Sequence, residues 1–233
     1  MKKYSHFSVG LTQQEIKWGA ICFVITLFLL PMLLQHGNAL LAKPLSASRL
    51  NFVYYCINFA AVVWIFRSFL WNSLKAGLRN PFSVIWYGLL GYLGSEALGE
   101  LLLIATYLVF PSFVNMNNQS IAAMVGQELH LMALATVILV PVAEETLFRG
   151  LLFRGLYGKN PAAAWLTSMV AFSAIHVVGY IGTLEPLHLL LSFIQYLPAS
   201  YCLCWTYRQT GTILSPILMH MIVNAMSIYN LTR

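Results

Sequence analysis

The chain has 233 residues, of which 59% are hydrophobic and only 9% are charged. Water-soluble globular domains carry about 25% charged residues, so this composition excludes such a domain and predicts an integral membrane protein. The 13 Lys and Arg residues outnumber the 7 acidic residues. They are scattered in short loops between apolar runs, which predicts a role in membrane topology and no nucleic-acid partner.

Seven segments are apolar over about 20 residues, the length that a helix needs to cross the hydrocarbon core of a bilayer. They predict an all-α fold, a polytopic membrane helix bundle of about seven transmembrane helices, with six or eight as alternatives. The polar stretch 115–127 contributes to this range, because it suits a loop or a short interfacial helix. The predicted spans are 18–36, 50–71, 82–110, 129–157, 161–180, 186–207 and 212–231.

Lysine and arginine favour the cytoplasmic side of a membrane. If the N-terminus lies in the cytoplasm, ten of these residues lie on the inner side and three on the outer side, so the distribution predicts a cytoplasmic N-terminus. The inner residues are Lys2, Lys3, Lys17, Arg67, Lys75, Arg79, Arg149, Arg154, Lys159 and Arg208, and the outer residues are Lys43, Arg49 and Arg233.

Four glutamates lie inside predicted spans, where an ionisable side chain costs roughly 3 kcal/mol and marks a candidate functional site. Glu145 and Arg149 have the i,i+4 spacing of a helical ion pair. Glu144 projects about 100° away and has no local counter-ion, so it is protonated, finds a distant partner or faces water as a base. Glu96 and Glu100 are like charges at i,i+4 spacing. We therefore expect one of them to be protonated or paired, and no motif assigns them a role.

Two histidine-containing stretches lie in other spans. "FSAIH" places Phe172 and His176 on one helix face, and "HMIVN" does the same for His220 and Asn224. At 1.5 Å of rise per residue from the cytoplasmic end of its span, Glu144 lies roughly 20 Å deep and His176 roughly 22 Å deep. His220 and Asn224 lie roughly 12 and 18 Å deep. Three spans therefore bring a carboxylate, two imidazoles and an amide to similar levels, which predicts one site.

These groups suit hydrolysis. A carboxylate and a neutral imidazole can hold and deprotonate a water molecule, while a second imidazole and an amide can donate hydrogen bonds to a developing oxyanion. A divalent metal, zinc, bound by Glu144, His176 and His220 is the alternative, because Glu with two His is a catalytic zinc set. A metal-independent mechanism and a metal mechanism both stay open.

Three motifs carry a resemblance to a known family. "EETLFRG" (Glu144 to Gly150), "FSAIH" and "HMIVN" resemble the EExxxR, FxxxH and HxxxN/D motifs of the CAAX protease and bacteriocin-processing (CPBP) intramembrane proteins, which include the type II CAAX prenyl endopeptidases. The motifs occur in the family's order on separate spans. The resemblance implies a catalytic core at 129–231, with residues 1–128 as N-terminal membrane helices of the same membrane domain.

The resemblance implies a role for each matching residue. Glu144 would activate the water together with His176, while His220 and Asn224 would stabilise the oxyanion. The residues implied to support the site are Glu145 and Arg149, through their ion pair, and Phe172, which would pack beside it. The implied enzyme is an intramembrane endopeptidase, a hydrolase of the metallo- or glutamate type.

The family also implies a class of substrate. Its better-known members cleave the C-terminal tripeptide after a prenylated cysteine, in a membrane cavity open to the cytoplasm, and many bacterial relatives are linked to bacteriocin maturation, self-immunity or secretion. The implied partners are the lipid bilayer and a membrane-associated or lipidated peptide or protein substrate, and the implied location is a bacterial cell membrane. Neither the individual substrate nor the oligomeric state follows.

Other intramembrane protease classes are excluded by what the sequence lacks. The chain has no aspartate, no HExxH motif and no GxSxG motif. Two alternatives without proteolysis remain. An ion-coupled transporter would use the four glutamates as a cation path and would show flux without peptide cleavage. A bacteriocin-immunity or scaffold protein would keep its protective effect after Glu144→Ala.

Overall fold

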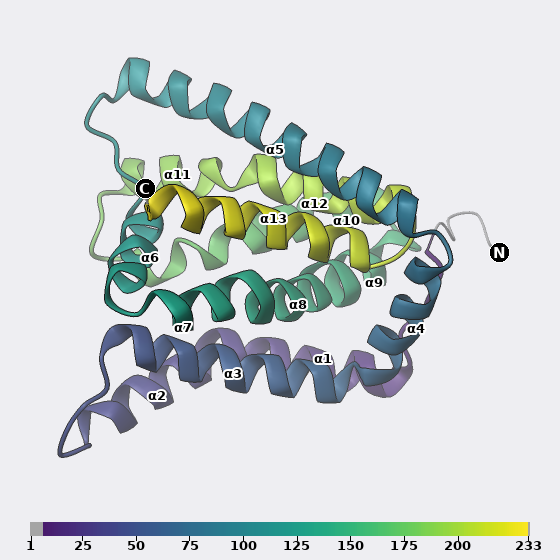
Figure 1. Ribbon diagram of the computed structural model, residues 1–233, viewed down its shortest axis with the longest axis horizontal. Helices are drawn as coiled ribbons and strands as arrows, with labels where there is room; N and C mark the ends of the chain where they lie inside the picture. Colours follow the sequence, from purple (N-terminus) through teal and green to yellow (C-terminus); the bar gives the residue numbers. More distant parts are fainter. Residues whose placement is uncertain (1–6, 233) are drawn as a thin grey trace.

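The computed structural model describes residues 7–232, which fold into helices with no β-strand among them (Figure 1). The expected all-α fold class is confirmed. The α-helices are α1 (Gln13–Val24), α2 (Leu30–Ala39), α3 (Ala47–Ile65), α4 (Arg67–Leu78), α5 (Pro81–Val109), α6 (Met116–Gln127), α7 (Leu129–Leu134), α8 (Val140–Glu145), α9 (Arg154–Tyr157), α10 (Pro161–Ile175), α11 (Pro186–Gln195), α12 (Leu197–Thr210) and α13 (Leu214–Leu231). The segments η1 (Ile25–Leu29), η2 (Ala135–Leu139) and η3 (Thr146–Phe153) are π-helical, and η4 (Val178–Tyr180) is a 3₁₀ turn.

Five helical stretches within the described residues are long and apolar enough to cross a membrane. The pair α3 and α4 would make a sixth if it counted as one span, and α10 is a shorter apolar helix. The predicted bundle of about seven spans agrees with this arrangement, apart from the C-terminal ends of two predicted spans. The five stretches are Gln13–Ala39, Pro81–Val109, Leu129–Tyr157, Pro186–Thr210 and Leu214–Leu231.

The predicted span 50–71 is wrong beyond Ile65, because the chain bends there by 81° into α4. Phe66 joins the two helices at φ −97° and ψ 19°, which is outside helical geometry. Its ring is fully buried against Gly19, where an added Cβ would lie 2.2 Å from the ring. The Glu15 carboxylate accepts the Phe69 N–H at 2.8 Å, so it satisfies a free donor in the first turn of α4. The buried ring and this hydrogen bond hold the bend.

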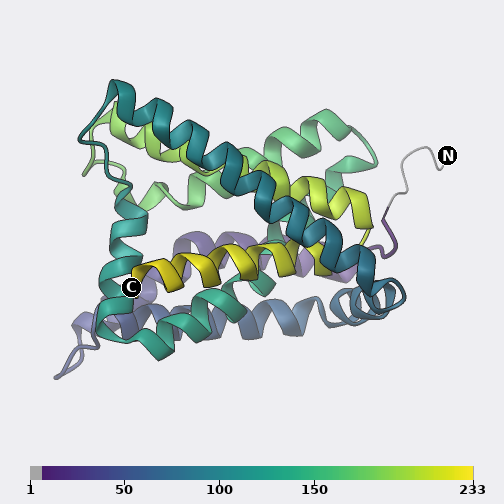
Figure 2. The same cartoon turned by 45° about the horizontal axis from the view of Figure 1, so that its top comes forward.

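Two helices lie across opposite ends of the bundle (Figures 1 and 2). At one end α4 exposes Trp71, with the Lys75 ammonium 5.0 Å from its ring centre, an arrangement that suits a membrane interface. At the other end α6 occupies the polar stretch 115–127, beside the C-terminus of α13. Of the two expectations for this stretch, the short helix is therefore the one observed.

The predicted span 161–180 is also too long, because α10 ends at Ile175 and His176 is its C-cap residue. The chain then continues as turns and the 3₁₀ segment η4 before α11 begins. Non-helical backbone at this depth is tolerated where it is buried in protein or lines a cavity. His176 therefore lies at a helix end inside the bundle.

Two of the three π segments immediately precede a proline turn. η1 is followed by Pro31, and η2 is followed by Pro141. Proline has no N–H to donate to the preceding turn, and its ring clashes with the carbonyl four residues earlier, so a wider turn relieves both problems. The π turn of η2 before Pro141 matters for the site, because α8 and its two adjacent glutamates follow it directly.

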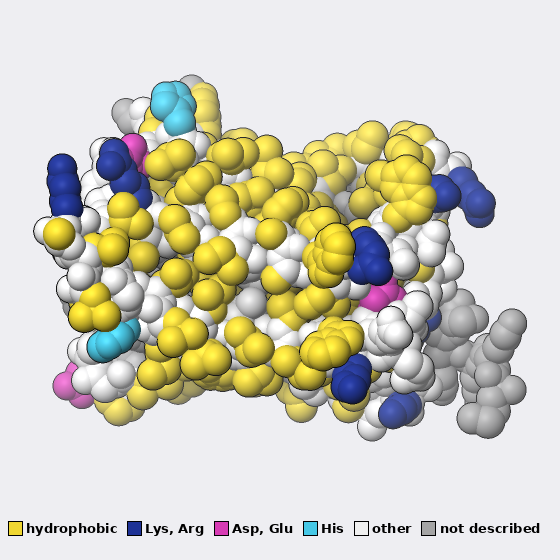
Figure 3. Space-filling view, turned by 90° about the horizontal axis from the view of Figure 1, so that it is seen from below, with side chains coloured by type: hydrophobic (Ala, Val, Ile, Leu, Met, Phe, Trp, Pro, Cys, Tyr) yellow, Lys and Arg dark blue, Asp and Glu magenta, His cyan; other side chains and the backbone are white. Residues whose placement is uncertain are grey.

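A belt of apolar side chains surrounds the bundle. Figure 3 shows it on one face of the molecule, between ends that carry charged side chains. Among the most exposed apolar residues are Trp64, Leu108 and Phe82, at 72%, 81% and 74%. Such a continuous apolar surface is stable against lipid and unstable against water. The protein is therefore an integral membrane protein.

Candidate active site

A cavity of about 930 Å³ lies within the bundle, and all four predicted catalytic residues line it. Glu144 comes from α8, His176 from the end of α10, and His220 and Asn224 from α13. The three separate spans therefore converge as their matched depths predicted. A cavity with a few polar groups on an apolar wall is the usual form of a binding or active site. This cavity is therefore the candidate active site.

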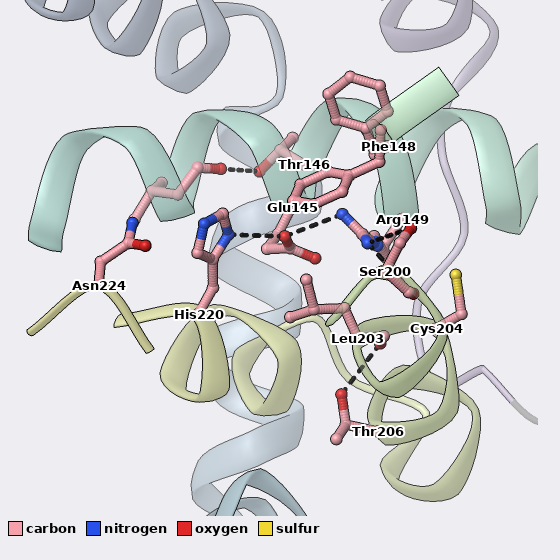
Figure 4. A network of polar contacts seen from close by, with 12 residues as sticks. Glu145, Thr146, Phe148, Arg149, Ser200, Leu203, Cys204, Thr206, His220 and Asn224 are labelled. Atoms are coloured by element: carbon pink, nitrogen blue, oxygen red, sulfur yellow. Dashed lines mark hydrogen bonds and ion pairs between the residues drawn. The ribbon is translucent and has the colours of Figure 1, made fainter. Parts of the chain in front are cut away.

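Glu145 is the centre of a buried polar network beside the cavity (Figure 4). Its Oε1 atom accepts hydrogen bonds from Arg149 Nη1 at 3.0 Å and from His220 Nδ1 at 2.9 Å. Arg149 Nη2 in turn donates to the backbone carbonyl and the hydroxyl of Ser200, at 3.3 and 3.0 Å. Glu145 and Arg149 are fully buried. The predicted ion pair is confirmed, and the sequence did not reveal its links to His220 and Ser200.

Phe172 covers this network on one side. The Arg149 guanidinium lies 4.1 Å from the centre of its ring, a cation–π contact. The same ring packs edge-on against Phe148 and His220, with centroids 5.5 and 5.8 Å apart. Phe172 therefore packs beside the site, as the motif implied.

Glu144 differs from its neighbour in its environment. It is half-buried and lines the cavity, whereas Glu145 does not. Its Oε2 atom is buried and has no hydrogen-bond partner in the protein. The Oε2 atom of Glu145 is also buried without a partner, but only Glu144 lines the cavity, so water or substrate that enters the cavity can pair with Glu144 Oε2. The asymmetry expected between the two glutamates is present.

His176 is held so that one ring nitrogen is free. Its Nδ1 atom lies 2.8 Å from the backbone carbonyl of Phe172. A carbonyl only accepts hydrogen bonds, so Nδ1 carries the proton and Nε2 of the neutral ring has a free lone pair. The Tyr196 ring stacks on the imidazole, at 4.2 Å between centroids. His176 is therefore oriented as a proton acceptor.

Tyr196 is a residue that sequence reasoning missed. Its hydroxyl donates to Asn115 and Asn118, at 3.2 and 3.0 Å, and accepts from Asn117 at 3.0 Å. The polar start of α6 thereby fixes the ring that stacks on His176. A tyrosine in an apolar span carries no signal of such a role. The asparagine-rich stretch at 115–118 was the visible hint.

Asn224 is also tied to a neighbouring span. Its Nδ2 atom donates to the backbone carbonyl of Thr136 at 2.7 Å, and the Thr136 hydroxyl donates to the carbonyl of Met132 at 2.7 Å. A primary amide has two N–H donors, so one of them remains for a substrate. This bond to η2 fixes the amide at the wall of the cavity.

The other two intramembrane glutamates lie elsewhere. Glu96 and Glu100 are exposed on α5 and do not line the cavity. Nothing in the structure assigns them a role in the site.

The two histidines of the cavity each have one ring nitrogen that could bind a metal ion. Nε2 is the free ring nitrogen of both His176 and His220, since Nδ1 of each is bound within the protein. Within residues 7–232, however, no three His, Cys, Asp or Glu side chains are grouped closely enough to hold a metal ion. The described side chains as arranged do not form the three-ligand set that the metal alternative requires.

Comparison with known proteins supports the motif resemblance. Residues 126–226 match a family model described as type II CAAX prenyl endopeptidase Rce1-like. The matched region begins just before α7 and ends within α13, so it includes every residue of the three motifs. No curated protein and no solved structure gave a significant match. The resemblance to the CAAX protease family is thereby confirmed over this part of the chain.

Proposed function

Because residues 126–226 match the Rce1-like type II CAAX prenyl endopeptidases, we propose that this integral membrane protein is an intramembrane endopeptidase that hydrolyses membrane-associated or lipidated peptides. One observation carries the proposal. The unpaired carboxylate oxygen of Glu144 and the imidazole of His176, with its free Nε2 atom, line the same cavity. A carboxylate and a neutral imidazole that line one cavity can hold and deprotonate a water molecule.

In the proposed reaction, water is the nucleophile. Glu144 accepts one proton from the water while Nε2 of His176 accepts a hydrogen bond from its second hydrogen. The water oxygen bonds to the carbonyl carbon of the scissile peptide, and the π electron pair moves onto the carbonyl oxygen. The tetrahedral intermediate then collapses, the C–N bond breaks, and the proton held by Glu144 passes to the leaving amine. The products are a carboxylic acid and an amine, and transfer of the acid proton to the amine gives a carboxylate and an ammonium group.

The oxyanion needs hydrogen-bond donors on the opposite side of the carbonyl. The second N–H of Asn224 is one donor, because the first is bound to Thr136. His220 holds its Nδ1 proton against Glu145, so it can donate from Nε2 only as an imidazolium with Glu145 as counter-ion. Glu145 therefore acts in the proposal by orienting His220, and Arg149 holds Glu145 in place.

Replacing the amide tests this assignment. Asn224→Ala is expected to lower kcat by about 10²–10³-fold, the loss typical of one oxyanion donor. Asn224→Leu keeps a similar volume but has no N–H donor, and it is expected to lower kcat to the same extent. The measurement is the cleavage rate of purified protein in liposomes. Asn72→Ala, which replaces an exposed asparagine on α4 that does not line the cavity, is the matched control. Full activity of Asn224→Ala would remove this residue from the mechanism.

The proposed activity can be tested before the substrate is known. We expect membranes of cells that produce the Glu144→Gln variant to accumulate uncleaved precursors that are absent from cells with wild-type protein. Quantitative proteomics of the two membrane fractions measures this difference. Glu185→Gln, an exposed glutamate outside the cavity, is expected to match the wild type. Identical proteomes for wild type and Glu144→Gln would contradict an endopeptidase activity.

A further inference from the structure

The catalytic cavity is closed toward one end of the bundle. That end is filled by an aromatic cluster of residues that are at most 7% exposed and do not line the cavity. The Phe7 ring packs against Tyr157 of α9 and Tyr207 of α12, and the Tyr207 ring packs against Phe153 of η3. The rings at the α3–α4 bend belong to the same buried core. Well-packed aromatic side chains exclude water and peptide. The cluster consists of Phe7, Phe66, Phe69, Phe153, Tyr157 and Tyr207.

Toward the other end the wall of the cavity becomes polar and exposed. Asn117 and Asn118 come from α6, which lies across this end, and Gln35 and Asn230 come from the ends of α2 and α13. Three of them, Gln35, Asn118 and Asn230, are exposed. Uncharged amides at a rim are compatible with water and with a peptide backbone. The cavity therefore opens at the end where α6 lies.

The charges on the two ends differ. Seven of the described Lys and Arg residues lie at the closed end, on the first turns of α1, on α4 and its flanks, around α9 and at the end of α12. The open end has two, and one of them, Arg49, is neutralised by Glu128 at 2.8 Å. Positive charge favours the cytoplasmic side of a membrane. The seven are Lys17, Arg67, Lys75, Arg79, Arg154, Lys159 and Arg208.

We propose that the cavity opens to the extracytoplasmic side of the membrane and receives an uncharged, mainly apolar peptide segment from the outer leaflet. The part of the proposal that concerns substrate rests on the proposed endopeptidase function. Glu144 is the only Asp, Glu, Lys or Arg among the described residues that line the cavity, so a charged segment would find no counter-ion there except next to the catalytic acid. This side is opposite to the cytoplasmic opening that the family resemblance implied.

Cysteine labelling tests the orientation without any need for activity. The starting protein replaces Cys22, Cys56, Cys202 and Cys204 by alanine. Single cysteines are then introduced as Asn230→Cys at the rim, Ala174→Cys on the cavity wall near His176, and Lys159→Cys at the closed end. Each variant, produced in bacterial inner membranes, is treated with a membrane-impermeant maleimide in spheroplasts and in inverted vesicles.

We expect Asn230→Cys and Ala174→Cys to react at least tenfold faster in spheroplasts, and Lys159→Cys to react only in inverted vesicles. The reverse pattern for Asn230→Cys and Lys159→Cys would overturn the orientation. Failure of Ala174→Cys to react in spheroplasts, while Asn230→Cys reacts there, would overturn the external opening of the cavity. Neither labelling result bears on the proposed endopeptidase activity. Conversely, identical proteomes for wild type and Glu144→Gln would contradict that activity without changing the measured orientation.

Discussion

Glu144→Gln is expected to lower kcat for peptide cleavage by about 10²–10⁴-fold, the usual contribution of a general base. Glutamine keeps the size of the side chain but cannot accept a proton from water. The contacts of the Glu145 carboxylate with Arg149 and His220 do not involve Glu144 and are expected to persist. The purified variant is therefore expected to fold and insert as the wild type does, and the loss is measured as the cleavage rate in liposomes.

His176→Ala is expected to cause a loss of similar size, because both residues act on the same water. For that reason the double variant is expected to lose little more than either single variant, as catalytic groups that work as a unit are not additive. His36→Ala, an exposed histidine near the end of α2, is the matched control. Additive losses in the double variant would show that Glu144 and His176 act in separate steps. Wild-type rates for either single variant would contradict its catalytic assignment.

The second large effect concerns stability. Arg149→Met is expected to destabilise the protein by about 3–5 kcal/mol, because it leaves the Glu145 carboxylate fully buried without its guanidinium partner. The Ser200 carbonyl and hydroxyl also lose their donor. The measurement is thermal unfolding in detergent. Arg67→Met, an exposed arginine at the start of α4, is expected to change the free energy of unfolding by less than about 1 kcal/mol.

A second substitution separates buried charge from lost packing. In Glu145→Gln with Arg149→Met, no unpaired charge remains in the core, so part of the lost stability is expected to return. If the double variant is as unstable as Arg149→Met alone, the lost stability comes from the packing of the guanidinium on Phe172. Wild-type stability of Arg149→Met would contradict a structural role for the ion pair.

The sequence alone predicted how residues of the same helix lie relative to one another. The Glu145–Arg149 pair follows from i,i+4 spacing, and the different surroundings of Glu144 follow from its rotation about the helix. Helical rise placed the histidines and Asn224 at similar depths, and the structure brings them to one cavity. These predictions worked because rise and rotation per residue are fixed by backbone geometry.

Contacts between helices could not be predicted in the same way. The bond between His220 and Glu145 joins residues 75 positions apart, and depth alone does not say which way a helix faces its neighbour. Tyr196 was missed because an aromatic residue in an apolar span is ordinarily a packing residue. The bend at Phe66 was missed for a related reason. Neither proline nor glycine marks it, and it depends on tertiary contacts with Gly19 and Glu15.

The central claim is that Glu144 and His176 activate a water molecule that attacks the peptide carbonyl. A single turnover in H₂¹⁸O, with enzyme in excess over a precursor identified from the Glu144→Gln membranes, tests it most directly. Mass spectrometry then locates the label. We predict ¹⁸O in the new C-terminal carboxylate of the product and none in the peptide that contains Glu144. Product without ¹⁸O, together with ¹⁸O in the Glu144 carboxylate, would show that Glu144 attacks the carbonyl itself and would contradict the claim.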